Sequence, residues 1–258
     1  MNVAALLRAN ARRMGRKTCL VFKGEELSYA RLDSRVDSLV RGFGALGLGQ
    51  GKKLALFLRN GIQWVELFFA ASRAGMVLVP VSFRSRGEEL KYVLEHSRPD
   101  ALAFDAFTRP VLEELLPEIN LGPVYIAAGE EEPPPWAIPY QKLALEGDGR
   151  LPWPEPRLAD LHSICYTSGS TGKPKGVMLT NANVVVGQYF NCLTVFPFRE
   201  EDVFVITTPL CHRTGWGRLV QAVGLGSTIC LMGTPYRPDE LVDIIASYRA
   251  TVVGMVPT

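Results

Sequence analysis

The residues best suited to chemistry lie in one run, YTSGSTGKPKG, at positions 166–176. Glycine lets the backbone adopt conformations closed to other residues and brings its amide groups close to an anion. The hydroxyl groups and lysines of the run add hydrogen-bond donors and positive charge. The run therefore predicts a phosphate-binding loop. Its candidate phosphate ligands are Thr167, Ser168, Gly169, Ser170, Thr171, Gly172 and Lys175, with Lys173 as a second cation.

The segments on both sides of this loop should position it. Residues 161–166 are predicted to form a strand, and residues 180–196 are predicted to form a helix with Thr180 as its N-cap. A phosphate loop commonly lies between a strand and a helix, because the first amide groups of a helix lack partners within it. The pattern of ordinary P-loop NTPases, G-x-x-x-x-G-K-[ST], does not fit, since counting from Gly169 puts Pro174 where Gly is required and Gly176 where Ser or Thr is required.

A second candidate site follows the strand expected at residues 203–207. Pro209 ends this strand, and if the chain turns helical after His212, then His212 and Trp216 lie four residues apart on one helix face. An imidazole can orient a carboxylate, and an indole can line or close an apolar cavity. The alternative is a hydrogen-bonded core histidine and a core tryptophan.

The run at 166–176 resembles the phosphate-loop signature of the adenylate-forming (AMP-binding) superfamily. This superfamily contains acyl-CoA synthetases, aryl-CoA ligases, luciferases and the adenylation domains of peptide synthetases. Two further segments, residues 74–80 and 209–215, are similar to a strand-entry motif and an acyl-pocket motif of the family in order and spacing. The resemblance extends from about residue 18 to the last residue. It is strongest to fatty-acid and aryl-CoA ligases.

The resemblance implies an acid–thiol ligase that joins a carboxylic acid to the α-phosphate of ATP, releases pyrophosphate and passes the acyl group to coenzyme A. The loop would then hold the β- and γ-phosphates, Lys175 would neutralise their charge, and Thr167 would lie near Mg²⁺. His212 and Trp216 would belong to the acyl pocket. Peptide-synthetase domains place an aspartate in this segment to pair with an α-ammonium, and residues 210–217 contain no acidic residue. A fatty or aryl acid is the expected substrate.

Some of the family's pattern is absent from these residues. The glutamate that binds magnesium, the aspartate that holds the ribose and the catalytic lysine of a mobile C-terminal domain do not follow, so no residue here is assigned a certain catalytic role. The resemblance thus implies the N-terminal part of such an enzyme, truncated before the remaining subdomains, and residues 1–258 alone are expected to be inactive. A non-catalytic nucleotide-binding or interaction module stays open as the alternative. Asn181 stands where the family commonly has histidine.

The order of the predicted elements decides the fold class. Strands and helices alternate as βαβ units, which predicts an α/β fold with two parallel-rich sheets flanked by helices. We expect a first lobe over residues 1–129, a proline-rich surface connection over 130–160, and a second lobe over 161–258 that begins with the phosphate loop. The other expected strands are 54–58, 76–81, 101–104, 124–127, 203–207, 227–232 and 251–256, and the other expected helices are 62–74, 87–96, 238–249 and one near Arg218.

Composition narrows the class further. The 258 residues are 47% hydrophobic and can bury a large core. A formal net charge of +2 gives no general attraction to nucleic acid. The partner that the resemblance implies is a small carboxylic acid, with a homo-oligomer left open. Glu66 and Arg73 interrupt the most apolar segment, so no transmembrane segment is expected.

Five cysteines without a C-x-x-C pair indicate reduced thiols in a cytoplasmic protein. The basic N-terminus is expected to be the first helix of the fold rather than a mitochondrial presequence.

Overall fold

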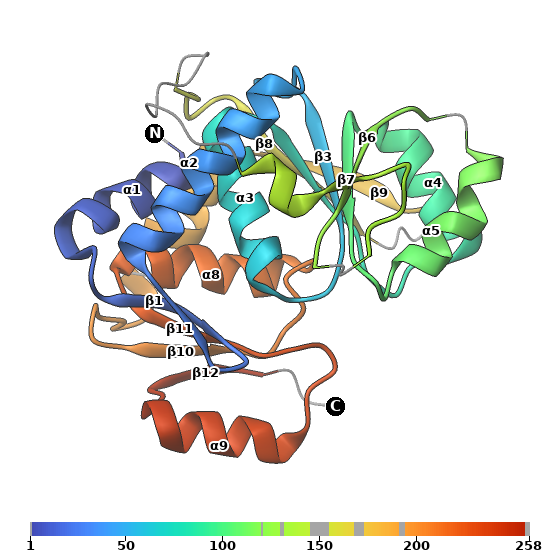
Figure 1. The fold of residues 1–258 in the computed structure, drawn as a ribbon. Helices are drawn as coiled ribbons and strands as arrows, with labels where there is room; N and C mark the ends of the chain where they lie inside the picture. Colours follow the sequence, from blue (N-terminus) through green and yellow to red (C-terminus); the bar gives the residue numbers. More distant parts are fainter. Residues whose placement is uncertain are drawn as a thin grey trace.

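Two β-sheets form the frame of the molecule (Figure 1). A computed structural model describes residues 2–119, 121–129, 132–144, 155–167, 173–190 and 194–255. Within these residues, the larger sheet has the order β7-β6-β5-β3-β4-β8-β9 and the smaller sheet has the order β12-β10-β11-β1-β2. The strands of the larger sheet are β3 (Lys53–Phe57), β4 (Val77–Pro80), β5 (Ala101–Phe104), β6 (Val124–Ala127), β7 (Ile138–Pro139), β8 (Leu161–Thr167) and β9 (Lys175–Thr180). Those of the smaller sheet are β1 (Thr18–Phe22), β2 (Glu25–Ser28), β10 (Val203–Ile206), β11 (Thr228–Leu231) and β12 (Val252–Gly254).

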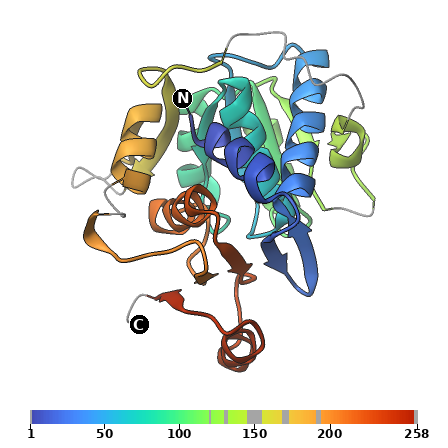
Figure 2. The same cartoon turned by 90° about the vertical axis from the view of Figure 1, so that its left-hand side faces the viewer.

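Neighbouring strands run parallel except at one edge of each sheet. There β2 pairs antiparallel with β1, and β9 pairs antiparallel with β8. Helices cover the faces of both sheets, so the predicted class of two parallel-rich sheets flanked by helices is confirmed (Figures 1 and 2). The α-helices are α1 (Val3–Met14), α2 (Tyr29–Ala45), α3 (Ile62–Ala74), α4 (Gly87–Ser97), α5 (Arg109–Leu115), α6 (Asn181–Val184), α8 (Arg213–Leu225) and α9 (Pro238–Tyr248). Short 3₁₀ segments form η1 (Leu116–Glu118) and η2 (Tyr140–Leu143), and η3 (Val185–Phe190) is π-helical.

A layer of four helices, α1, α2, α3 and α8, lies between the two sheets and forms the main core with them (Figure 2). Side chains alternate along β3, as the period of two in a strand requires. Leu54 and Leu56 face this helical layer, whereas Ala55 and Phe57 face the opposite side, which α4 and α5 cover. The outer face of the smaller sheet packs against α9 through Leu241.

Each sheet contains strands from both predicted lobes. β1, near the N-terminus, pairs in parallel with β11, and Leu20 lies opposite Ile229. β8, expected in the second lobe, instead extends the larger sheet by pairing with β4. The shared helical layer explains this exchange, because strands from both halves of the sequence must cover it to bury its apolar faces. The lobe boundaries at 129 and 160 stay a prediction.

Part of the proline-rich connection is not at the surface. Tyr140 and Leu143, both in η2, are buried against α2 and α3. The Tyr140 hydroxyl donates a hydrogen bond to the carboxylate of Glu66 on α3, which is fully buried and lies 2.5 Å from Nε of Arg35. A Cβ at Gly42 would lie 1.9 Å from the Leu143 carbonyl oxygen, so only glycine permits this approach. The expectation of a surface connection is therefore wrong for η2.

The Tyr140→Phe variant is expected to lose about 1–3 kcal/mol of unfolding free energy, because the buried Glu66 carboxylate loses a hydrogen-bond donor. Urea denaturation at neutral pH measures this loss. Tyr125→Phe is the matched control, since Tyr125 on β6 is partly exposed and its Phe variant keeps the ring that packs on Trp136. Equal losses in both variants would contradict the assigned role of the Tyr140 hydroxyl.

The N-terminal residues belong to the fold, as expected. Asn2 caps α1 by accepting a hydrogen bond from the amide of Ala5, and it donates one to the carbonyl of Ser72 on α3. Val3, Ala4 and Leu7 are buried. In the described part of the chain, no helix combines the length and apolarity needed to cross a bilayer. Cys19, Cys165, Cys211 and Cys230 are free thiols, and Cys192 lies outside the described residues.

Candidate functional site

The predicted phosphate loop joins two antiparallel strands. β8 and β9 pair as a hairpin from Leu161 opposite Thr180 to Thr167 opposite Lys175. The loop was expected to lie between a strand and a helix. This expectation is wrong in part, because strand β9 separates the loop from α6. Residues 177–179 are apolar, and their backbone groups find partners in the β8 ladder before the helix begins.

The helix that follows has the predicted cap. Thr180 accepts a hydrogen bond from the Asn183 amide at 3.2 Å, and Asn183 Oδ1 accepts one from the Thr180 amide at 2.9 Å. The helical segment continues from α6 into η3 as far as Phe190. Residues 191–193 are not described, and residues 194 and 195, within the range expected for the helix, are helical. The start of α6 lies at the far end of β9 from the loop. The N-terminus of α6 is therefore not placed at the predicted phosphate loop.

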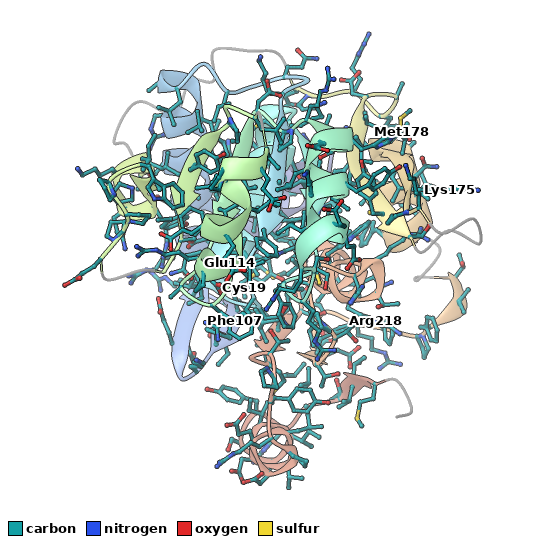
Figure 3. All side chains as sticks on the ribbon, turned by 90° about the vertical axis from the view of Figure 1, so that its right-hand side faces the viewer. Cys19, Phe107, Glu114, Lys175, Met178 and Arg218 are labelled. Carbon is teal, nitrogen blue, oxygen red and sulfur yellow. The ribbon has the colours of Figure 1, made fainter. Side chains whose placement is uncertain are left out.

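Thr167 and Lys175 lie together at the mouth of the hairpin. As direct partners across antiparallel strands, their side chains share one face of the sheet, with Cβ atoms about 4.5–5.5 Å apart. Both side chains are exposed, and Figure 3 shows Lys175 on the outer edge strand with Met178. The other predicted phosphate ligands, Ser168, Gly169, Ser170, Thr171 and Gly172, lie outside the described residues.

A cavity of about 640 Å³ lies beside this hairpin. Thr167 and Lys173 line it from the hairpin, and His212 lines it from the segment before α8. Another wall is α4, which contributes Glu88, Glu89, Glu95 and Lys91. The α4 side is therefore negative on balance and the hairpin side is positive through Lys173, so an anionic group is favoured next to the hairpin.

The structure separates the two residues predicted for the acyl pocket. His212 is the N-cap of α8 and lines the hairpin cavity. Partial burial of the imidazole and the positive charge of nearby Arg84 lower the pKa of His212. Its imidazole is therefore mainly neutral at pH 7. Trp216 is fully buried and packs against the rings of Phe68 and His162, each with a centroid 6.0 Å away. This burial fits the alternative of a core tryptophan, whereas His212 stays a predicted pocket residue.

Asn60, which the sequence analysis did not single out, holds the segment before His212. Its Oδ1 accepts a hydrogen bond from the Leu210 amide at 2.7 Å, and its Nδ2 donates to the Met232 carbonyl at 3.1 Å. At Gly215 an added Cβ would lie 2.4 Å from the Pro209 carbonyl oxygen, so the first turn of α8 packs directly on that segment. These contacts fix where His212 enters the cavity.

A larger cavity of about 730 Å³ lies elsewhere, near Asn60, Arg59 and Thr234. None of the described phosphate-loop residues lines it. We therefore assign the candidate site to the cavity beside the hairpin on chemical grounds.

The residues present fit a metal that arrives with a triphosphate. In the described part of the chain, no group of three or more His, Cys, Asp or Glu side chains could hold an ion. Mg²⁺ commonly keeps several waters and binds through substrate phosphates with one or two protein oxygens. The Thr167 hydroxyl on the cavity wall is an oxygen of this kind.

Sequence analysis also missed two residues, Tyr92 and His96, that contact the 166–176 run. The Tyr166 hydroxyl and His96 Nδ1 share a hydrogen bond of 2.7 Å. Tyr92 stacks on His96, and the Lys173 ammonium lies 5.7 Å from the centre of the Tyr92 ring. The signal was available, because Tyr92 and His96 are four residues apart on the helix predicted at 87–96.

The two sheets and their helices have the fold of the N-terminal domains of adenylate-forming ligases. The N-terminal domain of FACL13 from Mycobacterium tuberculosis matches with a TM-score of 0.87 at 22% identity, over 99% of this chain and 63% of that one. The long-chain-fatty-acid-CoA ligase FadD1 from Archaeoglobus fulgidus matches with a TM-score of 0.86 at 21% identity, over 97% and 50%. Residues 7–258 match the family described as AMP-binding enzyme. The chain belongs to this family.

Two relatives in sequence are CoA ligases. The 3-methylmercaptopropionyl-CoA ligase of Ruegeria pomeroyi is 28% identical over 240 residues, which cover 91% of this chain and 44% of that protein. The medium-chain-fatty-acid–CoA ligase of Ectopseudomonas oleovorans is 27% identical over 236 residues, covering 89% and 43%. The chain thus spans somewhat less than half the length of these relatives.

Proposed function

We propose that this chain is the N-terminal, ATP-binding part of an AMP-forming acid–thiol ligase that activates a fatty or aryl acid and transfers it to coenzyme A. The observation that carries the proposal is the hairpin. It sets Thr167 opposite Lys175 and, with Lys173, borders the cavity that His212 also lines. Membership of the AMP-binding family and relatives that are CoA ligases support it.

The proposed reaction has two steps. A carboxylate oxygen of the acid forms a bond to the α-phosphorus of ATP, and the bond from that phosphorus to pyrophosphate breaks. The sulfur of coenzyme A then forms a bond to the acyl carbon, and AMP leaves. Neither step needs a nucleophile from the protein, so catalysis depends on positioning and on neutralising charge.

The described residues have distinct roles in this proposal. Lys175 neutralises the β- and γ-phosphates, and the neutral imidazole of His212 orients the acid's carboxylate. Mg²⁺ supplies further neutralisation of the phosphates, and Thr167 is the residue that would hold it. Residues 210–217 contain no acid to pair with an α-ammonium, which favours an acid without an α-amine. We also propose a role in fatty acid metabolism in the cytoplasm, and the four free thiols support that location.

Lys175→Ala is expected to weaken ATP binding by about 10- to 100-fold and AMP binding by much less, because the lysine is assigned to phosphates beyond the α position. Isothermal titration with each nucleotide measures both dissociation constants. Lys142→Ala is the matched control, since Lys142 is an exposed lysine on η2, beyond the opposite edge of the larger sheet. Equal losses for ATP and AMP would refute the assignment.

Exchange of labelled pyrophosphate into ATP by the complete gene product tests the proposed reaction. Exchange that requires a carboxylic acid is the expected result, and a series of aliphatic and aromatic acids then identifies the preferred class. ATP binding without exchange for any acid would contradict the proposal and would favour a non-catalytic nucleotide-binding module.

A further inference from the structure

Helix α4 contacts the chain on both sides of the phosphate loop. His96 bonds to the hydroxyl of Tyr166, which precedes the loop, at 2.7 Å. Tyr92 faces Lys173, which follows the loop, with 5.7 Å between the ammonium and the ring centre. The two α4 side chains stack on each other, with ring centroids 5.4 Å apart and an interplanar angle of 20°. One pair of stacked rings therefore joins both ends of the loop to the same helix.

Tyr166 also connects the two strands of the hairpin. It lies opposite Gly176 on β9, and a Cβ added at Gly176 would lie 3.4 Å from the Tyr166 ring. The ring thus covers Gly176 while the hydroxyl reaches α4. Moving Tyr166 would displace the end of β8 and the beginning of β9 together.

The stacked pair is not what anchors α4 to the protein. The helix packs on the larger sheet through Leu90, Val93 and Leu94, which are buried in the core on that side. His96 is exposed and Tyr92 only partly buried. Removing the His96 side chain therefore leaves the packing of α4 in place.

We propose that Tyr92 and His96 are positioning residues for the nucleotide triphosphate: they hold Tyr166 and Lys173 so that the ends of the loop keep the geometry that the phosphates need. The inference rests on the proposed function of the same site. A rigid support lowers the cost of ordering these groups when the ligand binds, so it raises the affinity for ATP without entering the chemical step.

A double-mutant cycle with His96→Ala and Tyr166→Phe tests the inference in the complete gene product. Each single change is expected to raise the KM for ATP about 3- to 10-fold, with kcat changed less than twofold. The double variant is expected to be no worse than the weaker single variant, because both changes remove the same hydrogen bond. His96→Gln, whose amide can still bond to the Tyr166 hydroxyl, is expected to recover part of the affinity.

Tyr125→Phe is the control for the loss of a tyrosine hydroxyl and is expected to leave the KM for ATP unchanged. Urea midpoints of all variants equal to that of the unmodified protein are expected, since the anchoring residues of α4 stay. Additive effects of the two changes, or an unchanged KM in both single variants, would overturn the inference.

ATP dissociation constants measured in parallel separate this inference from the proposed function. If the unmodified protein exchanges pyrophosphate and the variants bind ATP as well as it does, the inference is wrong and the function stands. If the variants lose ATP affinity as expected but neither they nor the unmodified protein exchanges pyrophosphate, the positioning role stands. The proposal of a ligase activity is then wrong.

Discussion

The Trp216→Ala variant is expected to lose about 3–5 kcal/mol of unfolding free energy, the usual cost of removing a fully buried aromatic ring. Trp216 is inaccessible to solvent and lies among Phe68 on α3 and His162 on β8, so the change leaves a cavity where both sheets share the helical layer. Urea denaturation followed by circular dichroism measures the loss.

His212→Ala is the matched comparison, because His212 is exposed and lies one helical turn away. Its unfolding free energy is expected to change by no more than about 0.5 kcal/mol. A loss below about 1 kcal/mol for Trp216→Ala, together with an altered preference among acids, would return Trp216 to the acyl pocket that its sequence position predicted.

Acid is expected to destabilise the folded protein through His162. Complete burial lowers the pKa of this imidazole to about 4, whereas in the unfolded chain it titrates near 6.5. Between these values the unfolded chain binds a proton that the folded protein refuses, so stability falls as the pH falls. The loss from pH 7 to pH 4 amounts to about 3 kcal/mol.

The hydrogen bonds around His162 agree with a neutral ring. The Ser72 hydroxyl donates to the Phe68 carbonyl at 2.8 Å and therefore accepts from His162 Nε2–H at 3.2 Å. Nδ1 has no partner among the described residues. Unfolding free energies of the unmodified protein and of His162→Gln, compared at pH 7 and pH 4, isolate this contribution. The same acid loss in both proteins would show that other groups cause it, and an NMR titration of the imidazole reads its pKa directly.

Sequence alone predicted the elements whose length distinguishes helix from strand. The helix at 62–74 and the strands at 101–104 and 124–127 have the expected bounds, because a long apolar run is typical of a buried helix and a four-residue run is typical of a strand. The strand at 175–180 was not predicted. Its apolar run is too short to distinguish strand from helix by period, and its partner β8 had to be known first.

The candidate site was predictable in its residue types but not in its contacts. The loop composition and the family resemblance indicated Thr167 and Lys175, and strand pairing sets them opposite each other. The contact of His96 with Tyr166 joins residues 70 positions apart, and the burial of Trp216 depends on α3 and β8. Such contacts follow from the packing of distant elements, which local patterns do not encode.

The pairing of β1 with β11 can form only late in synthesis, because β11 is far from β1 in the sequence. Leu20 cannot meet Ile229 until the ribosome has made the roughly 200 residues between them, which takes on the order of 10–40 s at typical rates of elongation. During that time the apolar strand β1 is bonded to β2 alone, and its other edge is open to foreign chains. The smaller sheet is thus the part of the molecule that is completed late, and its open strand edge is a site for aggregation until β11 is made.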